Sequence, residues 1–282
     1  MAVNDTRIVI LGGRGMLGSD LAVTCTRRGL EPVVLDLPQF DITNAEDLRK
    51  AVADAGIIIN CAAYTNVDGA ESEAELAYRV NAEAVGRLGV LARQADAWVL
   101  HVSTDFVFDG RSDRPYVETD PPNPINMYGK SKLAGERLLA QSGCRHCILR
   151  VEWTYGAAGN NFVTRLTQRA KADKMLKVVD DQVGSPTATV EVSKAIFELL
   201  KNRPEGILHF ASAGYVSRYE MARFIVDKLS MAINVAPCKT GDFQSPAARP
   251  LNSRFDCSKI QRLLSEPIEE WQAPLERFLR QL

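Results

Sequence analysis

The sequence predicts an α/β fold, in which a doubly wound parallel sheet is interleaved with a smaller C-terminal lobe. Short runs rich in Val, Ile and Leu alternate with longer stretches of helical periodicity through the first two thirds of the chain, as expected of repeated strand–helix–strand units. The run Ile57 to Ile59 is continuously apolar, which is typical of strands covered on both faces. A glycine-rich turn joins the first strand to the first helix. Together these features favour one parallel sheet between two layers of helices.

The strands and helices of the first domain, expected over residues 1–150, alternate regularly. Parallel neighbours need a long crossover connection, which a helix supplies. Strands are expected at residues 7–11, 32–35, 57–60, 98–103 and 146–151. Helices are expected at residues 15–28, 44–55, 71–94 and 127–141.

The pattern is looser over residues 151–282, where we expect the smaller lobe to bind the substrate and to interleave with the sheet. Loops that contain Gly and Pro separate its elements, at residues 181–187 and 245–250. Helices are expected at residues 161–171, 190–201, 218–230 and 269–282. Strands are expected at residues 176–180 and 207–210.

Composition and charge exclude several classes of protein. The 282 residues are 46% hydrophobic and 24% charged, which is typical of soluble globular proteins. Lys and Arg number 34 against 35 Asp and Glu, and the net charge of −1 offers no general surface for nucleic acid or an anionic membrane. No apolar run approaches the roughly 20 residues of a membrane span, and Met1 to Asp5 lack the basic start of a signal peptide. With only six cysteines, we expect free thiols and a cytoplasmic protein.

The glycine-rich turn after the first strand indicates a dinucleotide site of the Rossmann type. Each of the three glycines in this turn has a role. Gly12 allows a tight turn, Gly15 lets the backbone approach a pyrophosphate, and Gly18 lets the helix pack closely on the strand. The phosphates then lie at a helix N-terminus, which favours negative charge. Asp36 follows the second strand and suits the ribose of NAD, whereas Arg14 would suit the extra phosphate of NADP. The expected cofactor is therefore NADPH or NADH.

A tyrosine and a lysine open the helix expected at residues 127–141. Tyr128 and Lys132 are four positions apart, so their side chains share a helix face. A free tyrosine has a pKa of about 10, and a neighbouring cation favours its phenolate, so the pair suits general acid–base catalysis. The alternative is that Tyr128 and Lys132 are only an exposed pair on a helix surface, which has the same spacing. However, Thr104 and Asp105 end the fourth strand, at the edge of the sheet where ligands bind, and we expect all four side chains around one site.

The order of these residues resembles that of the extended short-chain dehydrogenase/reductase superfamily. Five segments, in order, also look like the dTDP-4-dehydrorhamnose reductase family, and the resemblance covers essentially the whole chain. The segments are NCAAYTNVD (residues 60–68), STDFVFDG (103–110), YGKSKLAGE (128–136), DQVGSPT (181–187) and RPLNS (249–253). The resemblance implies hydride transfer from a reduced nicotinamide to the C4 ketone of dTDP-4-dehydro-β-L-rhamnose, giving dTDP-β-L-rhamnose.

The resemblance also implies roles for individual residues. Tyr128 protonates the developing alkoxide, Lys132 binds the nicotinamide ribose and lowers the pKa of the tyrosine, and Thr104 holds the sugar oxygen. Asp105 and Trp153 contact the sugar. The residues expected to bind the cofactor are Gly12, Gly15, Met16, Leu17, Gly18, Asp36, Asp41, Ile42, Ala62, Ala63 and Tyr64, together with Tyr128 and Lys132.

Several residues leave alternatives open. Arg249 and Arg254 are either ligands of the substrate diphosphate, which guanidinium groups suit, or ordinary surface charges. Phe106 and Glu152 depart from the family's usual Tyr and Ser, so the sugar is less firmly implied than the chemistry. Some family members are dimers bridged by magnesium through glutamates. Glu191 does not match that position cleanly, so no metal is predicted and a homodimer stays open.

The expected partner is a small nucleotide-sugar substrate and neither a nucleic acid nor a membrane. Two other functions remain: another nucleotide-sugar reductase or epimerase, and a non-catalytic, dinucleotide-binding regulatory subunit of a methionine adenosyltransferase. The intact pair of Tyr128 and Lys132 favours an enzyme. His101 and His209 lie in apolar strand runs with no second ligand at metal-binding spacing, and we interpret both as core residues.

Overall fold

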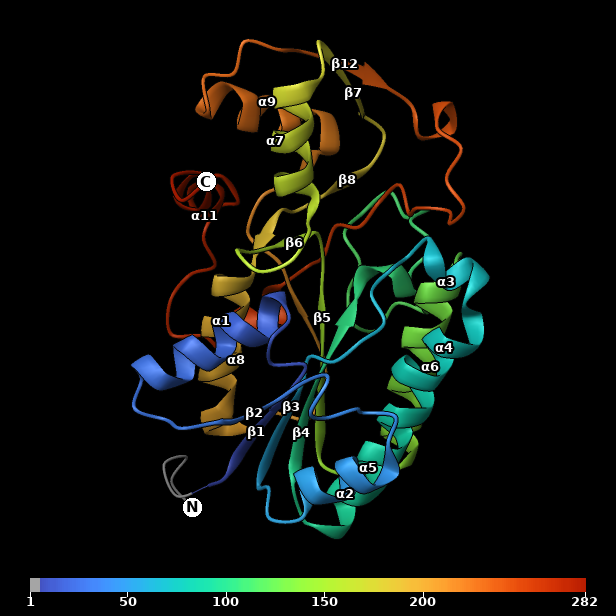
Figure 1. Cartoon of the computed structure of the whole chain (residues 1–282), viewed down its shortest axis with the longest axis vertical. Helices are drawn as coiled ribbons and strands as arrows, with labels where there is room; N and C mark the ends of the chain where they lie inside the picture. The colour runs from blue at the N-terminus through green and yellow to red at the C-terminus, as the bar shows by residue number, and fades with distance from the viewer. Residues whose placement is uncertain (1–5) are drawn as a thin grey trace.

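The computed structural model describes residues 6–282, and a six-stranded sheet lies at its centre (Figure 1). The strands are β1 (Ile8–Leu11), β2 (Val33–Leu35), β3 (Ile57–Asn60), β4 (Trp98–Thr104), β5 (His146–Val151) and β10 (Gly206–Phe210). They lie in the order β10, β5, β4, β3, β1, β2, and each neighbouring pair is parallel. The expected fold class, an α/β fold with a parallel sheet, is confirmed.

Helices cover both faces of this sheet (Figure 1). One face carries α1 (Met16–Arg27) and α8 (Thr189–Asn202). The other face carries α2 (Ala45–Val52), α5 (Ala84–Gln94) and α6 (Met127–Gln141). The sheet is therefore buried on both sides, as its continuously apolar strands predict.

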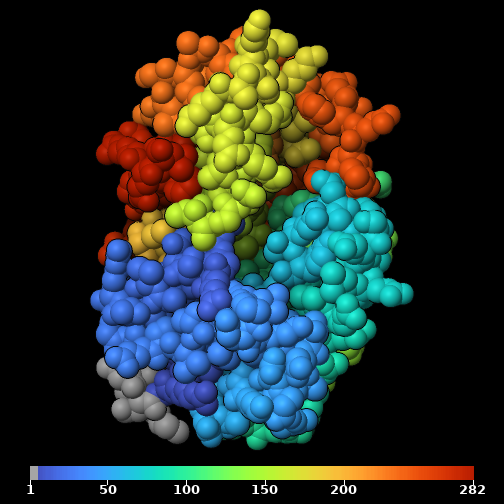
Figure 2. All heavy atoms as spheres, in the orientation of Figure 1, coloured from blue at the N-terminus to red at the C-terminus, as the bar shows by residue number. Residues whose placement is uncertain are grey.

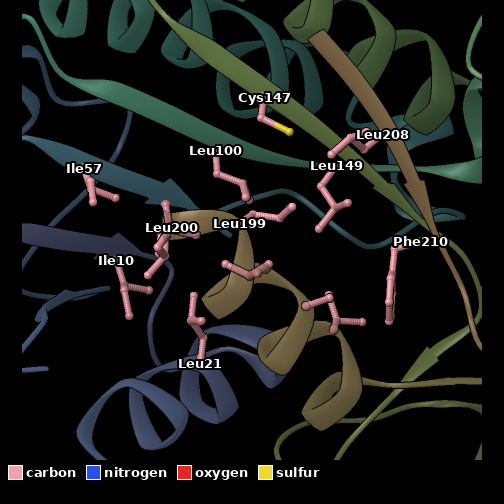
Figure 3. Packing of buried hydrophobic residues seen from close by; sticks show 14 of the residues in the cluster. Ile10, Leu21, Ile57, Leu100, Cys147, Leu149, Leu199, Leu200, Leu208 and Phe210 are labelled. Atoms are coloured by element: carbon pink, nitrogen blue, oxygen red, sulfur yellow. The ribbon is translucent and has the colours of Figure 1, made fainter. Parts of the chain in front are cut away.

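The two layers of core follow from the alternation of side chains along each strand. In β1, Ile8 and Ile10 pack on the face of α1 and α8, whereas Val9 and Leu11 pack on the opposite face. Figure 3 shows the first of these cores, where side chains of the strands meet those of α1 and α8, among them Leu199.

A smaller lobe lies at the top of Figure 1. In it β7 (Met175–Val179) pairs in parallel with β12 (Asn234–Cys238), and α7 (Phe162–Ala172), α9 (Arg218–Lys228) and α11 (Gln272–Leu279) pack around a shared core. Between β7 and β12 the chain returns to the main sheet to form α8 and β10. The short remaining elements are β6 (Thr154–Tyr155), β9 (Thr187–Ala188), β8 (Val183–Gly184), β11 (Val216–Ser217) and α10 (Ser258–Gln261).

The helix expected at residues 71–94 is divided in the structure. It consists of α3 (Gly69–Ser72), α4 (Ala74–Tyr78), a π-helical turn (Arg79–Glu83) and α5. Asn81 is fully buried in the π-helical turn, and its side chain accepts a hydrogen bond from the backbone of Tyr64 at 2.9 Å and donates to Ser131 at 3.0 Å. These contacts tie the helix to the loop after β3 and to α6. Because they are tertiary contacts, the apolar periodicity does not reveal the interruption.

Most other expected elements agree with the structure to within a few residues, and α6 spans the predicted residues 127–141. The sequence pattern does not indicate strand β12, whose sequence NVAPC contains a proline that strands tolerate only at an edge. Across residues 6–282, none of the helices has the length and apolar character needed to cross a membrane. Residues 1–5, which bear on the signal-peptide expectation, lie outside the described part of the chain.

Candidate active site

A cavity of about 620 Å³ lies at the carboxyl end of the sheet, between the sheet and the smaller lobe. The space-filling view is hollowed here, between the blue and cyan N-terminal segments and the yellow-green segment of the smaller lobe (Figure 2). Strands β1 and β3 are neighbours in the sheet but not in the chain, so the loops that follow them diverge, as at the ligand sites of open α/β sheets. A smaller cavity of about 380 Å³, between α1, α8 and residues 264–269, has none of the predicted site residues in its lining.

The glycine-rich turn is packed against the loop after β3. Gly12 has a φ of 72°, and a Cβ atom there would lie 2.5 Å from the backbone nitrogen of Ala62. A Cβ atom at Gly18 would collide with the carbonyl oxygen of Gly12. Side chains are therefore excluded at both positions, as close packing of loop, strand and helix requires. The cavity lining includes Gly12, Gly15, Met16, Leu17 and Gly18.

Asp36 fixes the turn from the end of β2. Its two carboxylate oxygens accept hydrogen bonds from the backbone nitrogens of Arg14 and Leu37, each at 2.7 Å. Asp36 lines the cavity, and its oxygens retain further lone pairs for a ligand. The side chain of Arg14 donates instead to the carbonyl oxygen of Leu37 at 3.2 Å and is absent from the lining.

The structure brings most of the other predicted cofactor residues to the same cavity. Its lining includes Asp41, Ile42, Ala62 and Ala63. Tyr64 is absent from the lining, because its hydroxyl donates a hydrogen bond to Glu73 and its backbone is bonded to the π-helical turn.

Tyr128 lies in the first turn of α6. Asn126 caps this helix, and its side chain accepts a hydrogen bond from a backbone N–H of the first turn at 2.8 Å. Phe106 packs edge-on against the Tyr128 ring, with centroids 5.5 Å apart. Burial raises the pKa of Tyr128 to about 12, although a hydrogen bond with Thr104 opposes the rise. The pKa of Tyr128 is therefore raised and not lowered, contrary to the expectation from Lys132, and the hydroxyl keeps its proton at neutral pH.

Lys132 lies one turn further along α6, where it is 2% exposed. Its Nζ atom donates to the carbonyl oxygen of Val102 at 2.7 Å and lies 3.3 Å from Nε2 of His101. Burial lowers the pKa of Lys132 to about 8, against the opposing effects of Glu136 and Cys61. The amine thus lies between fixed partners at the wall of the cavity.

Thr104 and Asp105 lie at the carboxyl end of β4, and both line the cavity. The Thr104 hydroxyl donates to Oδ1 of Asp105 at 3.0 Å, and Ser253 donates to Oδ2 at 2.5 Å. Burial raises the pKa of Asp105, and these hydrogen bonds oppose the rise. The segment RPLNS, which contains Ser253, therefore supports the site from a distant part of the chain.

Trp153 and Arg218 form the wall of the cavity on the side of the smaller lobe. Trp153 has a φ of 44°, which is unusual for a bulky residue. The guanidinium carbon of Arg218 lies 3.5 Å from the centroid of the Trp153 ring and 4.8 Å from that of Phe162. Burial lowers the pKa of Arg218 to about 9, while Asp105 and Glu152 oppose this change.

Arg218 is a charged residue of the cavity lining that the sequence did not predict. Its guanidinium group donates no hydrogen bond to any residue between positions 6 and 282, although it lines the cavity. In the sequence it is only the first residue of an expected helix, and no motif marks it. Its approach to Trp153 is produced by the fold of the smaller lobe.

The side chains of Glu152 and Arg249 are absent from the cavity lining. Glu152 is fully buried, and its carboxylate oxygens accept hydrogen bonds from the backbone nitrogens of Ser185 at 3.0 Å and Phe255 at 3.3 Å. Burial raises its pKa well above the usual value. Arg249 donates to both carboxylate oxygens of Asp68, at 2.9 and 2.8 Å. The structure therefore does not bring Arg249 together with Thr104, Asp105 and Trp153, since its charge is already paired.

The cavity residues fit a nicotinamide dinucleotide. At one end, a turn that excludes side chains at Gly12 and Gly18 leads into the N-terminus of α1, which suits a pyrophosphate. Asp36 offers a carboxylate beside this turn. At the other end Tyr128 and Lys132 provide a phenol and an amine.

Comparison with known proteins identifies relatives of the whole chain. The model of the family described as RmlD substrate binding domain matches residues 6–282. The dTDP-4-dehydrorhamnose reductase of Mycolicibacterium smegmatis is 38% identical over 275 residues, which cover 96% of this chain and 84% of the relative. The protein of the same name from Aggregatibacter actinomycetemcomitans is 38% identical over 288 residues, covering 96% of this chain and 98% of the relative.

A solved structure gives the same result. The crystal structure of dTDP-4-dehydrorhamnose reductase from Bacillus anthracis, in complex with NADP, matches with a TM-score of 0.94 and 35% sequence identity. The match covers 98% of this chain and 99% of that one. The chain belongs to the dTDP-4-dehydrorhamnose reductase family.

Proposed function

We propose that this protein uses NADPH or NADH to reduce the C4 ketone of dTDP-4-dehydro-β-L-rhamnose, giving dTDP-β-L-rhamnose. The observation that carries the proposal is the convergence of Thr104, Tyr128 and Lys132 on the cavity that begins at the glycine-rich turn. The names of the relatives support this substrate, and the NADP in the Bacillus anthracis structure supports the cofactor.

The division of labour follows the two parts of the chain. Residues 1–150 would hold the cofactor, with the pyrophosphate at the N-terminus of α1 and the adenosine ribose at Asp36. Residues 151–282 would form the substrate lobe, which contributes Trp153 and Arg218 to the cavity wall. The lobe is interleaved with the sheet because α8 and β10 belong to the larger part.

The bound reduced nicotinamide supplies a hydride for the ketone carbon. Tyr128 is protonated at neutral pH because burial raises its pKa, so its hydroxyl can donate a proton to the ketone oxygen as negative charge develops there. The Thr104 hydroxyl lies beside it and orients the same oxygen. When Lys132 is protonated, its charge favours the tyrosinate that remains after proton transfer.

The test is the oxidation of NADPH by purified protein in the presence of the dTDP-4-keto sugar, followed by the loss of nicotinamide absorbance. We expect Tyr128→Phe to lower kcat by about 100-fold to 10,000-fold, because it removes the general acid, while NADPH binding is retained. Tyr215→Phe is the matched control, since the hydroxyl of Tyr215 bonds to the backbone of Phe255 and lies outside the cavity.

Three results would contradict the proposal in different ways. Full activity of Tyr128→Phe would remove the proposed acid. Turnover of only a GDP- or UDP-sugar would reject the dTDP-sugar as substrate. Cofactor binding without turnover of any keto sugar, together with a stable protein partner in a pull-down, would favour a regulatory subunit.

A further inference from the structure

Hydrogen bonds beneath the cavity determine which nitrogen of His101, the histidine beside Lys132, carries the ring proton. The backbone nitrogen of Ala62 donates to Oδ1 of Asn60 at 3.1 Å, so Nδ2 of Asn60 faces the other way, 3.1 Å from Nδ1 of His101. An amide nitrogen only donates, and Nδ1 of His101 must therefore accept. Burial holds the pKa of His101 well below its usual value. The ring is neutral, and its single proton is on Nε2.

This proton points at Lys132, whose Nζ lies 3.3 Å from Nε2. A neutral amine has a lone pair that accepts the imidazole proton, whereas an ammonium group has only N–H donors. Moving the ring proton to Nδ1 does not remove the donor–donor contact, because that proton would then face the amide protons of Asn60. The charged form of Lys132 therefore meets one donor–donor contact in this network with either tautomer of His101.

We propose that Asn60 and His101 are positioning residues that disfavour the ammonium form of Lys132 in the free protein, so that binding of the dinucleotide is coupled to uptake of a proton by Lys132. The proposal rests on the proposed function, since the cavity must bind NADPH. The proton comes from solvent and forms the third N–H bond of Nζ. The oxygen atoms and negative charge of the ligand stabilise the ammonium group, so its pKa rises on binding.

Burial is the first cause of the lowered pKa of Lys132, and none of its charged neighbours disfavours the ammonium form further. The titratable groups that face it are Tyr128 and Glu136 on α6, His101 on β4 and Cys61 after β3. Burial raises the pKa of Tyr128 and of Cys61 to about 12 each, so both are neutral in the range where Lys132 titrates. Glu136 favours the ammonium group, but its own charge is paired with Arg150 at 2.6 Å. His101 is the neighbour whose N–H is directed at Nζ.

The test is calorimetry of NADPH binding at about pH 8.5, well above the pKa of about 6 of its phosphate group. Titrations in buffers with different ionisation enthalpies give the number of protons taken up. The native protein should take up about 0.7 proton per bound NADPH, because about a quarter of Lys132 is already protonated at this pH and its pKa rises on binding.

Two variants remove the donor–donor contact in different ways. In Asn60→Asp a carboxylate oxygen accepts from Nδ1 of His101, which leaves Nε2 free to accept from the ammonium group. His101→Phe keeps a ring but removes both nitrogens without adding charge. Each variant should take up less than about half as many protons as the native protein. Asn66→Asp is the control, because it adds the same charge at an exposed position of the loop after β3.

The outcomes separate this inference from the proposed function. NADPH binding and ketone reduction without proton uptake would overturn the coupling and leave the function intact. An effect in Asn60→Asp but not in folded His101→Phe would also overturn it, because added charge alone would then explain the result. Failure of the native protein to bind NADPH or NADH would contradict the proposed function itself.

Discussion

Arg150, which is buried, and Arg218, which is half-buried, differ in how their charge is satisfied. Arg150, on β5, is 2% exposed and donates to both carboxylate oxygens of Glu136, at 2.9 and 2.6 Å. It also lies over the ring of Phe108. Arg218 is stacked on Trp153, but it donates to no acceptor in residues 6–282 and faces the cavity.

We interpret this difference as a division between a charge that stabilises the fold and a charge that is available for binding. A buried charge that serves only the fold needs its full set of partners, since an unpaired ion in the interior is strongly destabilising. A charge that is held by aromatic rings and left with free donors is available to a ligand. We therefore expect substitution of Arg150 to affect mainly folding and substitution of Arg218 to affect mainly substrate binding.

Arg150→Met gives the largest expected effect. It leaves the carboxylate of Glu136 buried without its partner, which should lower the free energy of unfolding by about 3–5 kcal/mol. Urea denaturation measures this change. The double variant Arg150→Met, Glu136→Leu removes both charges and should recover much of the loss. If the double variant were as unstable as the single one, the unpaired carboxylate of Glu136 would not be the cause of the loss.

Arg218→Met should separate binding from folding. The loss of one charge-assisted hydrogen bond, about 1.5–3 kcal/mol, corresponds to a KM for the nucleotide sugar that is raised about 10-fold to 100-fold. The free energy of unfolding should fall by about 2 kcal/mol, the contribution of a cation–π contact that is shielded from water, and therefore by less than in Arg150→Met. Arg223→Met is the control, because Arg223 is exposed on the same helix. If KM were unchanged and the free energy of unfolding fell as far as in Arg150→Met, Arg218 would serve the fold and not binding.

Arg249 extends the comparison to a partly exposed pair and should give the smallest effect. Hydrogen bonds from Arg249 lower the pKa of Asp68 from its ordinary value of 3.8 to about 2. The side chains are 25% and 44% exposed, so the pair contributes less than about 1 kcal/mol. Because the pKa is lowered by folding, this stability is present above about pH 4 and is lost as the pH falls towards 2.

Arg249→Gln should therefore be slightly less stable than the native protein at neutral pH, and this difference should shrink as the pH falls from about 4 towards 2, as measured by urea denaturation across that range. Its KM for the nucleotide sugar should stay near that of the native protein. A large increase in KM would instead support the contact with the substrate diphosphate, one of the two alternatives that the sequence leaves open for Arg249.

Features set by local sequence could be predicted well. Gly12, Gly15 and Gly18 follow a strand directly, and Tyr128 and Lys132 share a helix face through their spacing alone. Their placement around one cavity follows from the rule that ligands bind at the carboxyl ends of parallel strands. The buried strands and most of the helices can be predicted for a similar reason, since their apolar periodicity is contained within each segment.

Features set by contacts between distant segments could not be predicted. The π-helical turn depends on Asn81 meeting Ser131, 50 positions away, and Arg249 is paired with Asp68 across 181 positions. Arg218 reaches the cavity only because the smaller lobe places it against Trp153. The residues that flank each of these side chains do not indicate its distant partner, so the pattern of a single segment cannot predict the contact.

The late position of β10 in the chain also constrains how the protein is made. β5 pairs with β4 on one side, but its partner on the other side, β10, is complete only at residue 210. While the ribosome adds the intervening residues, β5 is an unpaired edge of an apolar sheet, which is a template for pairing with another chain. A nascent chain that pauses before β10 is made therefore exposes an unpaired, aggregation-prone strand edge. Chaperones that bind such edges would be most needed at that stage of synthesis.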